Sequence, residues 1–285
     1  MKKKFLTVLV VAVVAIATLA LVACGGDGNA NKATVKVVDA QITALTEVKA
    51  GQSDAAIIDS TMAGYLLNNG SDFSDLAIAN VSDLVTEKEY YGVAAKKGKT
   101  KLIAFINNEM KKAQAEGGKY GELLTKYGLT ARKVDITDTF TVADDWKSEL
   151  NTAGKVVIGY TINAPMGIKN DDNTVTGFDI DLARAIFEPA GIAVETKLIN
   201  WDSKTVDLNA GKIDLVWNGL TINAERLETM EISAKYLVNE QAVVVKKANV
   251  DSIKKVADLA GKKVAVEADS AGLDAAEAIN ATLAK

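Results

Sequence analysis

GFDIDLA, at residues 177–183, is the stretch of sequence that decides which fold this chain adopts. It leads into a helix expected over residues 179–190, and this helix lies between strands expected at 156–159 and 194–199. A helix that connects two neighbouring strands implies that the strands run parallel with a right-handed crossover. The stretch therefore predicts an α/β fold built on a mainly parallel sheet.

The same alternation of β-rich runs and helical patterns continues on both sides of this stretch. Further strands are expected at residues 35–38, 55–58, 76–79, 91–95, 214–217, 241–245 and 264–266. Further helices are expected at residues 40–50, 59–67, 100–110, 120–127, 252–261 and from 271 onward. Residues 130–154 show little pattern apart from a short helix after Asp144, which is an unusual length for a loop. The chain length suits one large domain or two lobes of about 100–150 residues each.

The composition excludes several classes of function. The chain has 33 Lys and Arg against 37 Asp and Glu, and its net charge of −4 argues against a nucleic-acid partner. It contains no His, which excludes a Ser-His-Asp triad, a Cys-His pair and an imidazole metal site. A single Cys excludes an intramolecular disulfide and a multi-Cys zinc site. We expect no cofactor, no metal and no catalytic residue.

The first two dozen residues have the pattern of a secretion signal. Three lysines precede an uncharged run over residues 5–23, and the sequence LVAC at 21–24 resembles a bacterial lipobox. Residues 1–23 are expected to be a lipoprotein signal peptide, with Cys24 lipid-modified and residues 24–32 a flexible tether. The alternative is a retained membrane-spanning helix, because the run is long enough for one. On the lipoprotein interpretation the folded part is expected outside the cytoplasm and held at the membrane.

Several motifs resemble, in order, those of amino-acid-binding proteins of bacterial ABC importers, the family 3 solute-binding proteins. The motifs are GFDIDLA at 177–183, WDSK at 201–204, LNAGKID at 208–214, WNGLTI at 217–222, Arg226 and LAGKKV at 259–264. The resemblance implies the two-lobed type II periplasmic-binding-protein fold. It implies a receptor that captures a polar amino acid as its lobes close and delivers it to an ABC permease and its ATPase.

The order of the elements departs from the family. There the chain continues past the motif at 259–264 into a strand, a helix, an Ala-Gly-x-x-Asp-Ala strand and two final helices. Here such elements occur at the beginning, with AGQSDAAIID at 50–59 and helices within 100–128. This order predicts a circular permutation, with residues 130–154 as a linker between the ancestral ends. The alternative is two fused halves that complete themselves by swapping between chains, whereas the permutant is expected to be a monomer.

The permutation fixes the expected domains. Lobe 1 is expected at about residues 96–242, including the linker, and lobe 2 at about 33–91 together with 248–285. Strands near 91–95 and 243–247 are expected to form the hinge between them.

The resemblance also implies the residues that hold the ligand. Arg226 stands where the family binds the ligand carboxylate, and a guanidinium can grip a carboxylate through two parallel bonds. Asp59 stands where the family accepts the ligand ammonium, although an Asp there could simply cap the next helix. Supporting contacts are expected from the following residues: Gly219, Thr221, Ser270, Ala271 and Gly272. The side-chain pocket is expected to contain Tyr160, Asn163, Met166, Trp201 and Asn218, with Trp201 as readily explained by the core.

Two features weigh on the ligand and on rival functions. None of the expected pocket side chains is charged, which argues against a strongly basic or acidic ligand side chain. Residues 170–173, with the sequence NDDN, lack the spacing of a calcium loop and predict a hairpin turn. A dehydratase-like enzyme on the same fold, or a sensor or adhesin without transport, remains an alternative to the receptor.

Overall fold

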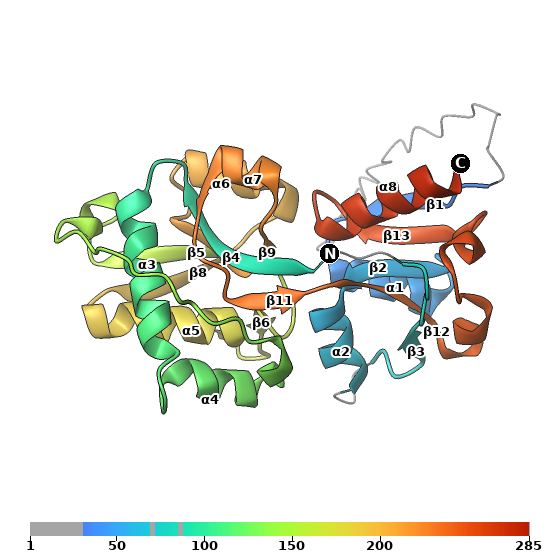
Figure 1. Ribbon diagram of the computed structural model, residues 1–285, viewed down its shortest axis with the longest axis horizontal. Helices are drawn as coiled ribbons and strands as arrows, with labels where there is room; N and C mark the ends of the chain where they lie inside the picture. The colour runs from blue at the N-terminus through green and yellow to red at the C-terminus, as the bar shows by residue number, and fades with distance from the viewer. Residues whose placement is uncertain (1–30, 69–71, 85–87, 285) are drawn as a thin grey trace, which may run out of the picture.

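The chain folds into two α/β lobes that lie side by side (Figure 1). The computed structural model describes residues 31–68, 72–84 and 88–284, so the expected signal peptide, Cys24 and most of the tether lie outside the described residues. Lobe 1 comprises residues 88–239, and lobe 2 comprises the described residues of 31–84 together with 241–284. The expected two-lobed α/β fold class is confirmed.

Lobe 2 is built on a five-stranded sheet with the strand order β1-β13-β2-β12-β3. The strands are β1 (Thr34–Val38), β2 (Ala55–Asp59), β3 (Leu76–Ile78), β12 (Gln241–Lys246) and β13 (Lys263–Glu267). Its helices are α1 (Gln41–Ala50), α2 (Ser60–Asn68) and α8 (Ala271–Leu283). The region expected as one helix at 252–261 instead forms two short 3-10 segments, Lys247–Ser252 and Val256–Leu259. That prediction was wrong because Ile253 adopts φ −123° and ψ 88°, which interrupts helical geometry.

Lobe 1 is built on a sheet with the strand order β10-β4-β9-β5-β8, and β11 also pairs with β4. The strands are β4 (Glu89–Lys96), β5 (Lys155–Tyr160), β8 (Ala193–Leu198), β9 (Leu215–Thr221), β10 (Met230–Ile232) and β11 (Leu237–Asn239). A separate hairpin pairs β6 (Ile168–Lys169) with β7 (Val175–Thr176) around the predicted turn. The helices are α3 (Thr100–Ala113), α4 (Lys119–Lys126), α5 (Phe178–Phe187), α6 (Lys204–Asn209) and α7 (Ala224–Thr229).

Each sheet has three adjacent parallel strands with antiparallel strands beside them. In lobe 2 β1, β13 and β2 run parallel, and in lobe 1 β9, β5 and β8 do. By contrast β12 and β4 run antiparallel to these neighbours. Each of them follows a passage from the other lobe and enters its sheet from the edge that faces that lobe, so it must run in the opposite direction.

The two strands expected at the hinge each lie within one sheet. The strands at 91–95 and 243–247 were expected to connect the lobes, but β4 lies wholly in one sheet and β12 wholly in the other. The chain passes between the sheets at two other places, the segment between β3 and β4 and the single residue Glu240 between β11 and β12.

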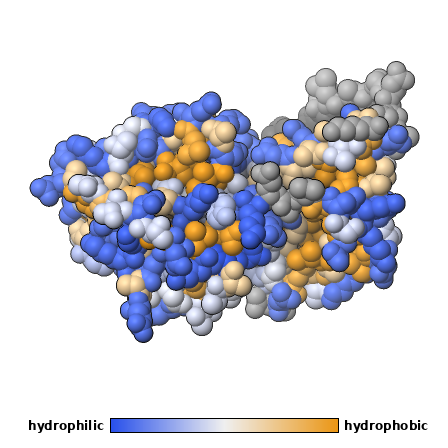
Figure 2. Space-filling view, viewed as in Figure 1, coloured by the Kyte–Doolittle hydropathy of each residue, from blue (hydrophilic) through white to orange (hydrophobic). Residues whose placement is uncertain are grey.

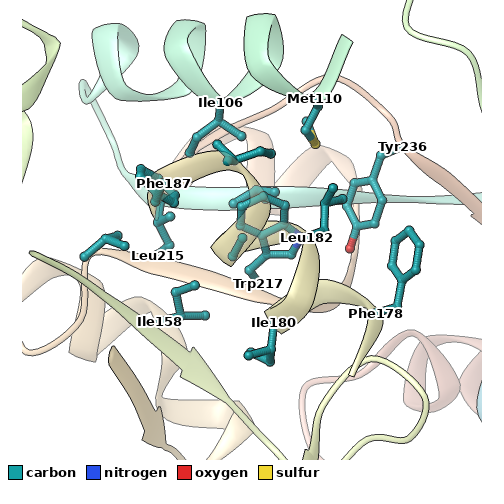
Figure 3. Close-up of a cluster of buried hydrophobic side chains, with 14 of the residues drawn as sticks. Ile106, Met110, Ile158, Phe178, Ile180, Leu182, Phe187, Leu215, Trp217 and Tyr236 are labelled. Atoms are coloured by element: carbon teal, nitrogen blue, oxygen red, sulfur yellow. The ribbon is translucent and has the colours of Figure 1, made fainter. Parts of the chain in front are cut away.

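The stretch GFDIDLA explains much of lobe 1. Phe178, Ile180 and Leu182 point from α5 into a buried cluster that also contains Trp217 and Tyr236 (Figure 3). Gly177 has φ +125°, and a Cβ there would lie 2.2 Å from the carbonyl oxygen of Met166. Only glycine therefore fits at that position.

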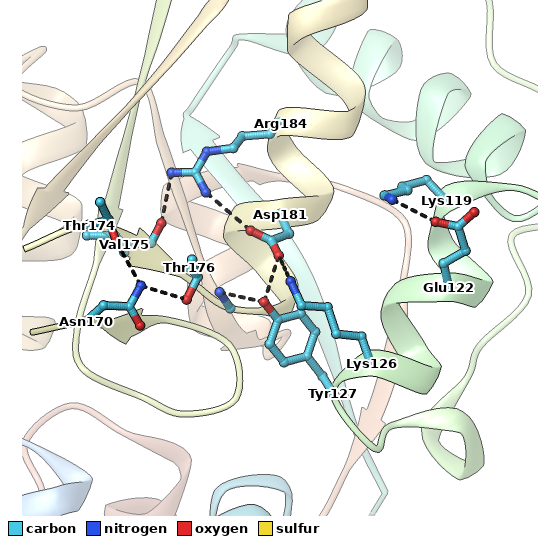
Figure 4. A network of polar contacts seen from close by, with 11 residues as sticks. Lys119, Glu122, Lys126, Tyr127, Asn170, Thr174, Val175, Thr176, Asp181 and Arg184 are labelled. Atoms are coloured by element: carbon cyan, nitrogen blue, oxygen red, sulfur yellow. Dashed lines mark hydrogen bonds and ion pairs between the residues drawn. The ribbon is translucent and has the colours of Figure 1, made fainter. Parts of the chain in front are cut away.

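The second acidic residue of the stretch joins two helices of lobe 1. The Asp181 carboxylate on α5 accepts bonds from Lys126 Nζ and Tyr127 Oη, both at 2.7 Å, and pairs with Arg184 (Figure 4). Tyr127 follows α4 directly, so this network fixes the packing of α4 against α5.

Residues 130–154 are not a free linker. They include 3-10 segments at Thr130–Arg132 and Trp146–Glu149, the second at the place expected for a short helix. The Trp146 ring stacks on Phe105 of α3 with the centroids 3.7 Å apart, and Ile136 and Leu150 are also buried in the core of lobe 1. The segment therefore belongs to lobe 1 by packing.

The surface carries no sign of a membrane-embedded helix within the described residues. Hydrophilic residues cover most of the visible face, with hydrophobic patches showing on both lobes (Figure 2). Among residues 31–68, 72–84 and 88–284 no helix combines the length and the apolar composition of a membrane span.

Candidate functional site

The polar residues of lobe 2 gather at one edge of its sheet. Asp59 ends β2, Glu267 ends β13, and Gln41 begins α1 soon after β1. Because these three strands are parallel and adjacent, their C-terminal ends lie along the same edge. Ligands of α/β sheets bind at such edges.

Lobe 1 presents the corresponding edge of its own parallel strands. Thr161 and Asn163 follow β5, Trp201 follows β8, and Gly219 and Thr221 lie at the end of β9. Arg226 lies on α7, whose N-terminus is capped by Asn223.

The two edges meet around a small cavity. It is lined by Gln41, Asp59, Thr161, Asn163, Trp201, Gly219, Thr221, Arg226, Glu267, Ser270 and Ala271. Its interior volume of about 10 Å³ is enough for about one water molecule, so the lobes are closed upon each other. Eight of the residues predicted from sequence line it: Asp59, Asn163, Trp201, Gly219, Thr221, Arg226, Ser270 and Ala271.

Asp59 is held by three amides. Its Oδ1 accepts hydrogen bonds from Asn239 Nδ2 and Gln241 Nε2, and its Oδ2 accepts one from Gln41 Nε2, each at 2.7 Å. Burial raises the pKa of Asp59, and the amide bonds act in the opposite direction. No bond runs from the Asp59 carboxylate to the backbone of the following helix α2 within the described residues, so it is not a helix cap.

Arg226 spans the space between the lobes. Its guanidinium donates from Nη1 to the Thr221 carbonyl at 2.7 Å within lobe 1 and from Nη2 to the Asp269 carbonyl at 2.8 Å in lobe 2. The side chain is buried, with its Cζ 5.9 Å from the centre of the Trp201 ring. A guanidinium has five N–H donors, so donors remain for a bound anion.

A second cation of lobe 1 reaches the same turn of lobe 2. Lys204 Nζ, on α6, lies 2.5 Å from Asp269 Oδ2 and 4.8 Å from the centre of the Trp201 ring. Burial lowers the pKa of Lys204, as does the nearby Arg226, while Asp269 raises it. Asp269 adopts φ +51°, a left-handed conformation that Asp tolerates better than most residues.

Glu89 lies at the start of β4, next to a crossing between the lobes, and hydrogen-bonds to residues of the site. Its Oε2 accepts bonds from Asn239 Nδ2 at 3.1 Å, Gln241 Nε2 at 3.0 Å and Thr221 Oγ1 at 3.2 Å. Burial and the nearby Asp59 raise the pKa of Glu89. The two crossings and the cavity therefore share one polar network.

Four of the residues expected in the site do not line the cavity. Tyr160 and Met166 are buried in the core of lobe 1. Asn218 lies beneath the site, where its Oδ1 accepts bonds from the backbone N–H and the hydroxyl of Thr161, both at 2.9 Å. A Cβ on Gly272 would come within 2.7 Å of the Ile57 carbonyl oxygen, so that glycine allows α8 to pack on β2.

The backbone N–H of Gly219 already has a partner within the protein. Its N–H donates to Asp179 Oδ2 at 2.7 Å, and the Tyr236 hydroxyl also donates to that carboxylate. Gly219 has φ +66°, so the buried Asp179 fixes a left-handed turn that shapes the site from below. Burial raises the pKa of Asp179 to about 7.

Sequence reasoning missed Gln41, Thr161 and Glu267. Glu267 gave a readable signal, because a charged residue closes the apolar run VAV at 264–266 just as Asp59 closes AAII at 55–58. Burial raises the pKa of Glu267 to about 8, and Asp59 adds to the shift while Lys204, Gln41 and Arg226 oppose it. Among the described residues no group of His, Cys, Asp and Glu could hold a metal ion.

Comparison with known proteins finds a family match in the second half of the chain. Residues 156–285 match the family described as bacterial extracellular solute-binding proteins, family 3. This segment is therefore similar to family 3 solute-binding sequences. It includes the lobe 1 edge of the cavity together with β12, β13 and α8 of lobe 2.

Individual relatives align with the chain over part of their length. The L-cystine-binding protein TcyJ of Escherichia coli strain K12 is 34% identical over 102 residues, which are 36% of this chain and 38% of that protein. A probable histidine-binding protein of Campylobacter jejuni is 30% identical over 159 residues, which are 53% of this chain and 61% of that protein. The chain therefore spans about two fifths of the first of these relatives and about three fifths of the second.

One solved structure illustrates the same partial similarity. It is a substrate-binding protein of an ABC uptake transporter from Streptococcus pneumoniae with bound histidine. It is 42% identical to this chain, the match covers 31% of this chain and 36% of that one, and the TM-score is 0.28.

Proposed function

We propose that this protein is a solute-binding receptor that captures a free amino acid between its lobes and delivers it to an ABC permease. The observation that carries the proposal is the pairing of a buried acid on one lobe with a buried arginine on the other around one cavity. A free amino acid presents an ammonium and a carboxylate close together, and Asp59 and Arg226 offer one partner for each. Relatives of the family 3 segment are named as binding proteins for amino acids.

The mechanism is reversible ionic recognition with no covalent step. The carboxylate binds the free donors of Arg226 on lobe 1, and the ammonium binds the open lone pair of Asp59 on lobe 2. Neither lobe holds both partners, so the ligand gains its full set of bonds only in the closed form. Binding therefore shifts the equilibrium towards closure, because the ligand has a higher affinity for that state.

The lobes must open before a ligand enters. The closed cavity of about 10 Å³ is too small for an amino acid. Closure is held by the bonds of Arg226 and Lys204 to Asp269, which both run between the lobes. We infer that the opening motion bends the chain at Glu240 and between β3 and β4.

Calorimetry against the twenty amino acids tests the proposal. We expect one or a few ligands to bind tightly, and small-angle scattering should show the molecule becoming more compact when they do. If no amino acid, opine or small peptide binds, the proposed function is wrong.

We further propose that the chain is a circular permutant that works as a monomer. Three strands from residues 31–84 share one sheet with β12 and β13 of the family 3 segment, and all five come from one chain. This arrangement supports completion within the chain. Light scattering on the purified protein should give the mass of one chain, whereas an obligate dimer would favour a swapped arrangement.

We propose that Cys24 anchors the receptor to the outer face of the cell membrane or in the periplasm. The support is the lipobox-like sequence LVAC at 21–24, which lies outside the described residues. Intact-mass measurement of the protein from membranes should show acyl chains on a chain that begins at Cys24. A Cys24→Ala variant should appear in the soluble fraction.

A further inference from the structure

Glu267 is the one acidic side chain of the cavity that the proposed capture of an amino acid does not use. It ends β13, is only 3% exposed and lines the cavity. The rest of that strand is apolar apart from its exposed first residue, so the glutamate is not part of a solvated face. Burying a carboxylate is costly unless it is paired, so its presence here requires a reason.

No residue that the structure describes forms an ion pair with Glu267. The nearby Gln41 amide lowers the pKa of its carboxyl group, but this amide is neutral and donates to Asp59. The two nearby cations are engaged elsewhere, since Lys204 pairs with the Asp269 carboxylate and Arg226 donates to two backbone carbonyls. The buried carboxylate is therefore left facing the cavity.

The cavity has more acidic groups than cations. Lys204 pairs with Asp269, which leaves the carboxyl groups of Asp59 and Glu267 with the single cation Arg226. Glu89, bonded to the same amides as Asp59, is a further acid. Burial raises the pKa of Glu267 to about 8, so at neutral pH this carboxyl group holds a proton when no further cation is near. A zwitterionic amino acid with a neutral side chain leaves it protonated, whereas a ligand with one more positive charge allows it to ionise.

We propose that the ligand is an α-amino acid with a positively charged side chain, and that Glu267 pairs with that charge. The inference rests on the proposed function, with Asp59 and Arg226 holding the α-ammonium and the α-carboxylate. It differs from the expectation of a ligand without a strongly basic side chain, because Glu267 adds an ionisable side chain to the cavity lining. The alternative role for Glu267 is to help Asp59 bind the α-ammonium.

The pairing predicts different pH profiles for two classes of ligand. Without ligand the buried Glu267 carboxyl group holds a proton below about pH 8. A neutral side chain leaves that proton in place, so the affinity for such a ligand changes little between roughly pH 5 and 8. A cationic side chain displaces the proton, so the affinity for a cationic ligand rises by up to about tenfold per pH unit over the same range. Asp59, Lys204 and Arg226 are the charged groups that face Glu267, and all three are present in both complexes.

Calorimetry on the full chain with L-arginine, L-lysine and the neutral arginine analogue L-citrulline tests the inference. We expect wild type to prefer the two cations, and Glu267→Gln to weaken arginine binding at least about tenfold while changing citrulline binding less than threefold. Glu277→Gln, an exposed change on α8, is the matched control and should alter neither. The pH profile of the wild type provides a second test that needs no variant.

The outcomes separate this inference from the proposed function. If a neutral amino acid binds wild type best and Glu267→Gln has no effect, the inference is overturned while the receptor function stands. If Glu267→Gln weakens every amino acid equally, Glu267 serves the α-ammonium and the inference is also overturned. If no amino acid binds at all, the proposed function itself has failed.

Discussion

The two lobes differ in the composition of their cores, and they contribute side chains of opposite charge to the same cavity. The core of lobe 1 is aromatic, with Trp217, Phe178 and Tyr236 packed together, and all three tryptophans of the chain lie in this lobe. The core of lobe 2 is almost wholly aliphatic, built on residues such as Ile57 and Val243. At the cavity lobe 1 contributes the cations and lobe 2 contributes the carboxylates of Asp59, Glu267 and Asp269.

This difference suggests a division of labour. The carboxylates of lobe 2 stand close together and repel one another, as do Lys204 and Arg226 on lobe 1. The repulsion within each set is reduced when the set faces the opposite charges of the other lobe. A ligand that carries charges of both signs has the same effect. Neither lobe alone is therefore electrostatically complete, and closure brings the two halves of one site together.

The largest expected effect is on stability, and it comes from truncating a large side chain in the aromatic core of lobe 1. Trp217→Ala should lower the free energy of unfolding by about 3–5 kcal/mol, because a fully buried indole leaves a cavity that cannot collapse. Tryptophan fluorescence reports on lobe 1 alone, whereas circular dichroism reports on both lobes. In urea the variant should lose fluorescence at a lower concentration than it loses the ellipticity of lobe 2. Coincident transitions would mean that the lobes unfold as one unit.

The next largest effect is on ligand binding, where the two charged residues of the site can be tested one at a time. Arg226→Ala should weaken ligand binding by about 2–5 kcal/mol, because it leaves the ligand carboxylate buried without its partner. Asp59→Asn should weaken ligand binding by a similar amount, because it removes the negative charge that pairs with the ligand ammonium. Calorimetry measures both, with Arg184→Ala on α5 as a control that lies outside the cavity. An unchanged affinity in Arg226→Ala would remove that residue from the site.

A pH titration of stability compares one buried acid in each lobe. Burial raises the pKa of Asp179 to about 7 and that of Glu267 to about 8, above their values in the unfolded chain. The native state then binds more protons than the unfolded state between about pH 4 and 8, so stability falls as pH rises through this window. Each group contributes at most about 1.4 kcal/mol per pH unit.

The Glu267→Gln variant tests whether Glu267 causes the fall in stability at the upper end of this pH range. Without ligand, it should flatten the fall in stability between pH 7 and 8, while Asp179 continues to act below pH 7. Urea unfolding at half-unit intervals provides the measurement. A slope that is the same in wild type and variant would show that Glu267 stays ionised in the folded protein.

The smallest expected effect concerns the ion pair that spans the lobes. Asp269→Asn removes the negative charge next to Lys204 and keeps a side chain that tolerates φ +51°. Because the Asp269 side chain is about half exposed, at 49%, the change should weaken ligand binding by only a factor of about two to five. Small-angle scattering of the unliganded variant should show a more open average shape. A gain in affinity would contradict the role assigned to this pair.

Local pattern predicted the elements well, because each strand of the parallel cores is a short apolar run between turn residues. Asp59 and Arg226 could be placed at one site because their motifs resemble those of a known family. Residues 130–154 were expected in lobe 1 as a linker, but their packing could not be predicted, since it depends on the contact of Trp146 with Phe105, about forty residues earlier in the chain. Gln41 escaped notice because its role depends on the neighbour of β1 in the sheet, which no local pattern shows.

At the Glu240 crossing, the number of residues between the two lobes determines the geometry of the binding site. Asn239 and Gln241 flank this residue and both donate to Asp59 Oδ1, because residues two apart in extended chain point to the same side. Glu240 itself is exposed, which is usually the mark of a position that tolerates insertions. Here one added or deleted residue would turn one of the two amides away from Asp59. This surface position should therefore accept many side chains and no change in length.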